Sequence, residues 1–483
     1  MGSPLNILIA ASEIYPFAKT GGLADACGAL AKALRNLGHN VRVVLPKYRC
    51  VRDSQYDLRK RPERISVPVG PHKVEGEIYE GELAPGVPAC FIAQDAYFDR
   101  DHLYGPPAGA YYDNAERFIF FSRAVLELCR VTRFRPDIIN CNDWQTGLIP
   151  VFLKTLFIYD AFFRKTRTVF SIHNLGYQGE FDRTNLTLAH LPFSLFNADG
   201  VEFHGDLNFL KSGLVYADLL STVSETYARE ILRPEYAFRL EGVLGKRAAN
   251  LHGIANGIDY SEWNPTLDPW IIRQFSDDNP AGKKLCKSDL LQQFDLEQDL
   301  ALPLMCMVTR LTSQKGVDLV MQVIQRNLLE KAQLIVVGVG DPGYEEFFKN
   351  RAGHRLGLFL GFDEPLAHRV LAGADFLLMP SVYEPCGLTQ MQAMKYGTVP
   401  VVSAVGGLED TVTPYSPETG EGLGFKFSPY GLEFFETALD RALTTYDDQA
   451  HWNRLVLNCL RANFSWDRSA REYERIYRIA LSH

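Results

Sequence analysis

The chain has 483 residues, 46% of them apolar, so it can bury large cores and is not a disordered protein. Its 50 basic and 58 acidic residues leave a formal net charge of −8, which argues against nucleic acid or an anionic membrane as the main partner. The length predicts two or three domains. Nine dispersed cysteines without CxxC or metal-ligand spacing indicate free thiols in a reducing compartment.

The first apolar run, at 5–11, is too short for a signal peptide or a membrane span, so we expect it to be the first strand. A loop with KTGGLAD at 19–25, a helix ending near Gly38 and a second strand at 41–46 complete a βαβ unit. The loop glycines let the backbone approach a phosphate closely, and Lys19 can reach the same anion. Alternatively, the glycine pair only shapes the loop, since it does not match the dinucleotide fingerprint GxGxxG.

Residues 62–112 alternate in the manner of antiparallel strands and hairpins. They contain a DxD triplet at 99–101, a motif that holds a metal–diphosphate in some glycosyltransferases. No clear apolar strand precedes this triplet, so we interpret it as a solvated loop. The stretch 104–112 is rich in Gly, Pro and Tyr, which suits the wall of a sugar-binding site.

Two later strands of the first half end in polar side chains. The strand at 136–142 is followed by Asp143, and the strand at 168–172 is followed by His173. Ligands of open α/β sheets bind at the carboxyl ends of the strands, so these side chains are candidates for one site with the first strand's loop. The alternatives are that Asp143 caps the following helix and that His173 has a structural role.

The composition becomes rich in turns near NGID at 256–259, which marks a domain boundary. A polar helical connector at 268–300 leads to a strand at 304–309, which is followed by RLTSQKG at 310–316. An Arg and a Lys in this order suit a diphosphate, the Arg as a planar fork and the Lys as a point charge, although they also fit a solvated pair. Further on, Phe362 suits either stacking on a base or packing in the core.

The most informative stretch follows an apolar strand at 374–380. A turn at 381–388 carries Glu384 and leads into a helix at 389–397, and VGGLED at 405–410 is a weaker echo of KTGGLAD. A strand-to-helix turn offers backbone N–H groups to an anion. The Glu384 carboxylate instead suits a neutral polyol or a developing cation. The stretch therefore predicts a substrate that is part phosphate and part sugar.

Four motifs in this order resemble the signatures of bacterial glycogen synthases and plant starch synthases: KTGGLAD at 19–25, HNLGYQG at 173–179, RLTSQKG at 310–316 and EPCGLTQ at 384–390. The resemblance covers nearly the whole chain, from residue 7 to about residue 479. It implies an α/β fold of GT-B type, in which two doubly wound, Rossmann-like domains face a deep interdomain cleft. The implied parts are 1–250 on the acceptor side, 251–460 on the nucleotide-sugar side, and 461–483, a helix that crosses back to the first domain.

The resemblance also implies a reaction. The enzyme would be a retaining hexosyltransferase that moves glucose from ADP-glucose to the non-reducing end of an α-1,4-glucan such as glycogen, starch or a maltooligosaccharide. Retention would proceed by front-face attack with the leaving phosphate as base. No cofactor and no metal are expected, because two cationic side chains can replace a metal on the diphosphate. The motif spacing does not separate ADP from UDP donors.

The same resemblance bears on partners and location. Neither nucleic acid nor a membrane is expected as a partner, and a homo-oligomer is left open. The expected location is the cytoplasm, or the plastid stroma if this is a trimmed plant or algal chain.

The family's functional residues carry over to matching positions in this chain. The implied catalytic residues are Lys19, Asp143, His173, Arg310, Lys315 and Glu384. The implied substrate-binding residues are Glu13, Gly21, Gly22, Asp25, Tyr104, Asn174, Asn256, Phe362, Cys386, Gly387, Leu388 and Thr389. The cations would meet the departing diphosphate, and the histidine and the two catalytic carboxylates would surround the sugar. A lysine of related synthases also matches Lys287.

Two features depart from the family pattern. The family often has histidines around the aspartate at 143, where this chain has Asn140, Asn142 and Gln145. Related glycosyltransferases often carry a second Glu eight residues after the first, and this chain has Gln392 there, so a second-carboxylate role is not available.

Two other functions are weighed against this one. A glucosyltransferase of the same architecture with another acceptor, such as a sucrose-forming enzyme, would differ in the acceptor it uses. A non-catalytic glucan- or nucleotide-binding protein is disfavoured by the intact charged residues of the four motifs. A nicotinamide dehydrogenase is disfavoured because no GxGxxG follows a strand, and a P-loop because Gly242, Gly245 and Lys246 have the wrong spacing.

Overall fold

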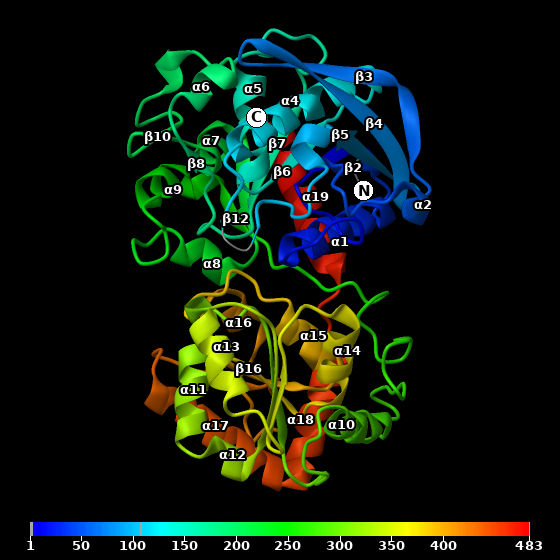
Figure 1. Cartoon of the computed structure of the whole chain (residues 1–483), viewed down its shortest axis with the longest axis vertical. Coiled ribbons are helices and arrows are strands. Elements are labelled where there is room, and N and C mark those ends of the chain that lie inside the picture. Colours follow the sequence, from blue (N-terminus) through cyan, green and yellow to red (C-terminus); the bar gives the residue numbers. More distant parts are fainter. Residues whose placement is uncertain (1–2, 107–108, 483) are drawn as a thin grey trace. The chain divides into compact units, whose positions relative to one another are not determined.

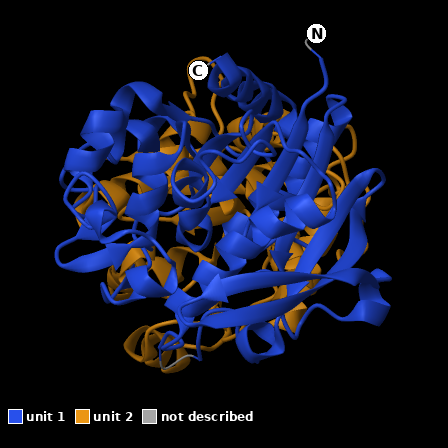
Figure 2. Cartoon of the chain, turned by 90° about the horizontal axis from the view of Figure 1, so that it is seen from above, with its two compact units in different colours: residues 1–257, 466–483 blue, residues 258–465 orange. Residues whose placement is uncertain are grey.

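The computed structural model describes residues 3–106 and 109–482, which form two compact units. Unit 1 comprises 1–257 and 466–483, and unit 2 comprises 258–465; Figure 2 shows them in blue and orange. The chain thus leaves unit 1 after Gly257 and returns to it for its last helix. Each unit is built on a mainly parallel sheet with crossover helices, so the predicted doubly wound α/β fold class is confirmed.

Unit 1 contains a nine-stranded sheet in the order β12-β11-β7-β6-β1-β2-β5-β4-β3. The seven strands from β12 to β5 run parallel, and β4 and β3 extend the sheet in antiparallel fashion. Their bounds are β1 Asn6–Ala10, β2 Asn40–Pro46, β3 Arg59–Val69, β4 His72–Ala84, β5 Val87–Ala93, β6 Ile138–Asn142, β7 Arg167–Ile172, β11 Leu219–Thr222 and β12 Leu251–Gly253. A small sheet adds β8 Glu180–Phe181, β9 Glu202–Phe203 and β10 Asp206–Asn208.

The helices of unit 1 cover this sheet. Their bounds are α1 Gly22–Asn36, α2 Asp53–Tyr56, α3 Asp95–Phe98, α4 Asn114–Val131, α5 Leu148–Lys154, α6 Asn185–Leu188, α7 Phe209–Tyr216, α8 Glu225–Glu230, α9 Glu241–Arg247 and α19 Trp466–Ser482. Helix α19, red in Figure 1, packs against α1 and β7. It forms an amphipathic helix whose apolar stripe, which includes Tyr473, Ile476 and Tyr477, is buried.

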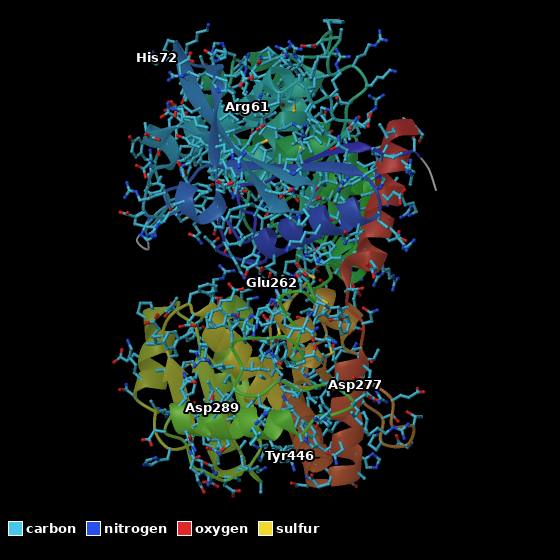
Figure 3. The ribbon with its side chains drawn as sticks, turned by 90° about the vertical axis from the view of Figure 1, so that its right-hand side faces the viewer. Arg61, His72, Glu262, Asp277, Asp289 and Tyr446 are labelled. Carbon is cyan, nitrogen blue, oxygen red and sulfur yellow. The ribbon has the colours of Figure 1, made fainter. Side chains whose placement is uncertain are left out.

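The antiparallel end of the unit 1 sheet is a long ribbon of β3 and β4, as the alternation at 62–112 predicts. Figure 3 labels Arg61 on this ribbon and His72 at one end of it. Arg61 pairs with Glu63 and Glu80, both at 2.9 Å. These part-buried ion pairs keep a sheet edge charged.

The DxD triplet lies beyond this ribbon. Its two carboxylates, Asp99 and Asp101, both accept hydrogen bonds from the Arg49 guanidinium, at 2.8 and 2.6 Å, and all three side chains are exposed. The triplet is therefore part of a surface ion-pair cluster, as the interpretation of a solvated loop predicts.

Unit 2 contains a six-stranded parallel sheet in the order β15-β14-β13-β16-β17-β18. Its strands are β13 Leu304–Val308, β14 Gln333–Val337, β15 Leu356–Phe359, β16 Phe376–Met379, β17 Val399–Ser403 and β18 Phe425–Phe427. Its helices are α10 Gly282–Gln293, α11 Val317–Gln325, α12 Leu328–Lys331, α13 Pro342–Lys349, α14 Glu364–Gly373, α15 Thr389–Lys395, α16 Gly406–Thr411, α17 Leu432–Asp447 and α18 Gln449–Arg461. Figure 1 shows the strands between two groups of these helices.

The order of strands reverses once in each unit. In unit 1 the chain builds outward from β1 through β2, and then returns to add β6 on the other side of β1. In unit 2 it builds outward from β13 through β14, and then adds β16 on the other side of β13. A reversal of this kind leaves a crevice outside the carboxyl ends of the two central strands, where ligands of such sheets bind. The loops after β1, β6, β13 and β16 are therefore the places to look for a site.

The segment that follows Gly257 packs on the rest of unit 2 through buried polar and aromatic groups. The His368 Nδ1 lies 2.7 Å from Asp268 Oδ2, and Tyr396 donates its hydroxyl hydrogen to the same carboxylate. The Trp263 ring stacks on His368 with 3.8 Å between the ring centroids. The predicted polar helical connector contains α10, whose buried Lys287 donates to Asp375 at 2.7 Å. Lys287 is thus an internal anchor of unit 2.

Among the helices in the part of the chain that the structure describes, none has the length and apolar content needed to cross a bilayer. All nine cysteines are free thiols, and eight of them are buried.

Candidate active site

The loop after β1 is organised by the buried carboxylate of Glu13, which is 3% exposed. One of its oxygens accepts from the Tyr104 hydroxyl at 2.6 Å and from the Thr20 hydroxyl at 2.7 Å. The backbone N–H groups of Thr20 and Gly21 also donate to this carboxylate. Burial raises the pKa of Glu13, and these four donors oppose that shift. Glu13 and Tyr104 therefore hold the KTGGLAD loop in place from within.

The glycine at position 21 is not explained by the shape of this loop. Its φ of −166° is extended backbone that any residue adopts. A Cβ built on Gly21 would have no described atom within 4 Å, and the residue is exposed. The backbone conformation therefore does not require a glycine at position 21, and the space beside it is open. Gly22 begins α1, and Lys19 pairs with Asp25 at 2.9 Å.

Asp143 joins the ends of β6 and β7. Its side chain accepts hydrogen bonds from the backbone N–H of His173, at 2.7 Å, and from that of Asn174. It makes no side-chain cap to the short helix η1 (Trp144–Thr146) that follows it, so the alternative of a helix cap is wrong. Burial raises the pKa of Asp143 to about 7.

His173 lies at the end of β7, where its ring Nε2 is 2.9 Å from the side-chain oxygen of Asn142. Burial lowers the pKa of His173 to about 4, so the imidazole is neutral near pH 7. The side chain of the neighbouring Asn174 accepts from the Gly176 N–H at 2.9 Å and so shapes the turn after the strand. The strand order thus brings the predicted Asp143, His173 and Asn174 together.

The second group of predicted residues lies at the order reversal of unit 2. Lys315, after β13, donates to the Glu384 carboxylate, after β16, at 2.5 Å. Ser381 donates its hydroxyl hydrogen to the same Glu384 oxygen at 3.0 Å. Glu384 is 6% exposed and Lys315 is partly buried, so Lys315 is not a solvated cation. Arg310 is exposed in the loop directly after β13.

A glycine makes this pairing possible. Gly316 has a φ of +67°, and a Cβ on it would lie 1.8 Å from the Pro380 carbonyl oxygen. Only glycine tolerates both the left-handed backbone and this contact. The chain can therefore bring Lys315 against the loop that carries Glu384.

The turn that follows Glu384 rests directly on a second pair of glycines. A Cβ on Gly406 would lie 2.0 Å from the Glu384 carbonyl oxygen, and one on Gly407 would lie 2.0 Å from that of Cys386. The Gly407 N–H donates to the Glu384 carbonyl at 3.0 Å. The two glycines of VGGLED at 405–410 are therefore needed for close packing against the turn after Glu384. The similarity of this motif to KTGGLAD did not predict that role.

The remaining turn residues, Cys386, Gly387, Leu388 and Thr389, lead into α15, whose Gln390 fixes their path. The Gln390 amide nitrogen donates to the carbonyls of Cys386 and Gly387, at 3.1 and 2.8 Å, and to the Thr411 hydroxyl at 3.0 Å. Sequence reasoning missed this residue, because a glutamine in a helix carries no signal of burial.

Two further predicted residues lie apart from these groups. Phe362 lies between β15 and α14 and is 76% exposed, so the alternative that it packs in the core is wrong. Asn256 is buried near the end of the first segment of unit 1, and its side-chain oxygen accepts no hydrogen bond from the described residues. Within those residues, no group of three His, Cys, Asp or Glu side chains is arranged to hold a metal ion.

Family models match residues of both units. Residues 6–246 match the model of the starch synthase catalytic domain, and residues 291–454 match that of glycosyl transferases group 1. These ranges contain the loops after β1, β6 and β7 in unit 1 and those after β13 and β16 in unit 2.

Full-length relatives share close to half of their residues with this chain. The glycogen synthase of Koribacter versatilis (strain Ellin345) is 45% identical over 480 residues, which is 99% of this chain and 98% of the relative. The glycogen synthase of Syntrophotalea carbinolica is also 45% identical over 480 residues, or 99% of each chain.

Two solved structures resemble the chain over its whole length. The catalytic domain of starch synthase IV from Arabidopsis thaliana, bound to ADP and acarbose, matches with a TM-score of 0.94 and 33% identity over 100% of both chains. Sucrose-phosphate synthase from Thermosynechococcus elongatus matches with a TM-score of 0.62 and 19% identity over 99% of both chains, which is a likeness of fold alone. With a GT-B fold, the four motifs and full-length relatives, the chain belongs to the glycogen and starch synthase family of hexosyltransferases.

Proposed function

We propose that this member of the family transfers glucose from ADP-glucose to the non-reducing end of an α-1,4-glucan with retention of configuration. The observation that carries the proposal is the pairing of Lys315 with Glu384 beside the turn that opens α15. A cation and turn amides suit a diphosphate, and a carboxylate next to them suits sugar hydroxyls or positive charge that develops on the sugar ring.

The reaction moves charge in two directions. The bond from the anomeric carbon to the diphosphate breaks, and a bond to an acceptor hydroxyl oxygen forms on the same face. The proton of that hydroxyl passes to the departing phosphate, so the products are ADP and a lengthened glucan. Arg310 and Lys315 offset the negative charge on the diphosphate, and one well-placed donor contributes on the order of 3 kcal/mol to such a step. The Glu384 carboxylate stabilises the positive charge that develops on the sugar ring.

In unit 1 we assign His173 and Asp143 to the sugar and the loop to the anion. The His173 imidazole is neutral near pH 7, and burial raises the pKa of the Asp143 that braces it, which suits contact with uncharged hydroxyl groups. Lys19 and the open surface at Gly21 suit an anion that approaches the backbone. No resident metal takes part in this proposal.

Two observations support the finer points. The relative from Arabidopsis thaliana was solved with ADP and acarbose, which favours an adenine nucleotide and a sugar chain as ligands here. The nine free thiols suit a reducing compartment, which supports the cytoplasm as the place of action.

The test is a transfer assay with radiolabelled ADP-glucose and UDP-glucose, each with and without glycogen. We expect label in the precipitated glucan from ADP-glucose, with release of ADP. Label from UDP-glucose only would keep the reaction and overturn the donor. Nucleotide binding without label in glucan from either donor would overturn the proposal and favour another acceptor.

A further inference from the structure

The ring of His173 is held by a residue that is not part of the four motifs. Asn142 is the last residue of β6, is buried, and places its side-chain oxygen 2.9 Å from His173 Nε2. An asparagine amide has an accepting oxygen and a donating nitrogen, and the two ends are interchangeable in shape. Which end faces His173 therefore decides which ring nitrogen of His173 carries the proton.

The surroundings of Asn142 leave one orientation. Its amide nitrogen faces the Ala10 carbonyl at 3.0 Å, the Asn140 carbonyl at 3.2 Å and the Asn140 side-chain oxygen at 3.1 Å. Carbonyl oxygens only accept hydrogen bonds. A flipped amide would set an oxygen against three other oxygens in a buried place, at the cost of every one of these bonds. The donating end of Asn142 must therefore face β1 and Asn140.

The partner of Asn142 is itself held. The Asn140 amide nitrogen donates to the Ser171 hydroxyl at 2.9 Å, and Ser171 and Ser221 share a hydrogen bond of 2.8 Å. The network runs through buried residues of four parallel strands, β1, β6, β7 and β11. A fully satisfied buried network of this kind is rigid.

The oxygen of Asn142 accepts, so His173 Nε2 must donate. A neutral imidazole has one N–H, which leaves Nδ1 without a proton. Burial keeps the ring neutral, and Asp143 bonds the backbone N–H of His173, not its ring. Among the described residues, no protein group makes a hydrogen bond to Nδ1.

We propose that Asn142 is a positioning residue that holds His173 in the Nε2–H tautomer, so that Nδ1 accepts a hydrogen bond from a hydroxyl of the ligand. A lone pair at Nδ1 attracts a hydroxyl hydrogen and repels the oxygens of a phosphate, so the ring selects the polyol part of the substrate. An asparagine does not titrate, so this acceptor state does not depend on a second ionisable group. The identity of the ligand rests on the proposed function, but the tautomer does not.

The first measurement is NMR of the imidazole nitrogens in the full chain labelled at histidine. The His173 signals are assigned by their loss in His173→Gln. We expect Nε2 to carry the proton and Nδ1 to be unprotonated at neutral pH. A proton on Nδ1, alone or together with Nε2, would overturn the proposal. This outcome does not depend on whether the chain transfers glucose.

The second measurement changes the partner. Asn142→Asp keeps the shape but adds a negative charge and removes the donor, so the pKa of His173 should rise and Nδ1 should gain a proton near neutral pH. Glucose transfer should then fall roughly tenfold to a hundredfold, by analogy with the loss of a group that orients a metal-ligating histidine. Unchanged His173 signals and rate in Asn142→Asp would contradict the proposal, and if this variant does not fold, the wild-type spectrum decides.

A matched control is Ser221→Ala. It removes a hydroxyl from the same buried network without touching Asn142 or His173. We expect the His173 signals and the transfer rate of this variant to equal those of the wild type. Altered His173 signals in Ser221→Ala would mean that general loosening, rather than the Asn142 oxygen, sets the tautomer.

Discussion

The two groups of candidate residues lie at equivalent places in their sheets but differ in their electrostatics. In unit 1, Asp143 is buried and His173 is part-buried; burial raises the pKa of Asp143 to about 7 and lowers that of His173 to about 4. In unit 2, Lys315 and Glu384 form an ion pair with 2.5 Å between nitrogen and oxygen. A neutral imidazole beside a carboxyl group of raised pKa suits uncharged hydroxyls, and an ion pair beside turn amides suits a charged diphosphate. The reversal of strand order therefore places residues of different chemistry at the same position in the two sheets.

The glycines of the two groups differ as well. Gly316, Gly406 and Gly407 are required by the fold, because a Cβ on each would lie 1.8 to 2.0 Å from a backbone oxygen. Gly21 meets no such barrier from the described residues. Gly316, Gly406 and Gly407 therefore serve packing, whereas we propose that Gly21 serves the ligand.

The largest effect is expected from Glu384→Ala, which removes the carboxylate of unit 2. Turnover should fall roughly a hundredfold to a thousandfold, the range for loss of one electrostatic group, while the chain stays folded. Initial rates and circular dichroism of the variant measure the two effects. Ser381→Ala is the matched control, because it removes one hydrogen bond to Glu384 and keeps the charge. A Glu384→Ala enzyme with the wild-type rate would refute the role of the carboxylate.

The contrast between glycines predicts opposite outcomes for two alanine substitutions. Gly316→Ala should lower the free energy of unfolding by roughly 2 to 4 kcal/mol, because it combines a positive φ with a contact to Pro380. Gly21→Ala should change it by less than about 0.5 kcal/mol and yet slow glucose transfer. Urea unfolding and transfer rates test the pair. Equal loss of stability in both variants would remove the distinction between the two glycines.

The shifted pKa of His173 predicts a pH effect on stability. The folded chain keeps this ring neutral down to about pH 4, whereas the unfolded chain protonates it near pH 6.5. Proton uptake by the unfolded state lowers stability as pH falls through this window. The wild type should therefore lose up to a few kcal/mol relative to His173→Gln between pH 6.5 and pH 4. Urea unfolding of both proteins at several pH values is the measurement.

Asp143 contributes with the opposite sign. Its folded pKa of about 7 lies above the ordinary 3.8, so the unfolded chain loses its proton first and stability falls as pH rises from about 4 to about 7. The two terms oppose each other in the wild type, which is why the difference between wild type and His173→Gln is the informative quantity. A difference that does not change with pH would contradict the lowered pKa of His173.

The smallest effect is expected from removal of divalent metal. If Arg310 and Lys315 supply the positive charge for the diphosphate, dialysis against EDTA should leave the transfer rate within about twofold of its starting value. The control is the same assay after Mg²⁺ is restored. A rate that collapses with EDTA and recovers with Mg²⁺ would show that a metal ion shares this task.

Much of the fold was predictable because its signals are local. The helix predicted at 389–397 is α15, Thr389–Lys395, and the apolar run at 374–380 contains β16, Phe376–Met379. Strand ends with polar residues likewise pointed to Asp143 and His173. The roles of neighbours such as Asn142 and Gln390 were not predictable, because a buried amide looks like an exposed one until its partners are known.

By itself, the sequence determined the alternation of strands and helices, the family and the motifs that carry charge, because periodicity and turn chemistry act over a few residues. Only the tertiary structure decided that Lys315 meets Glu384, that Gly406 and Gly407 support the turn after Glu384, and that Asn142 orients His173. These contacts join residues on different strands or on the loops that follow them. Their geometry follows from strand order and register, which no short stretch of sequence encodes.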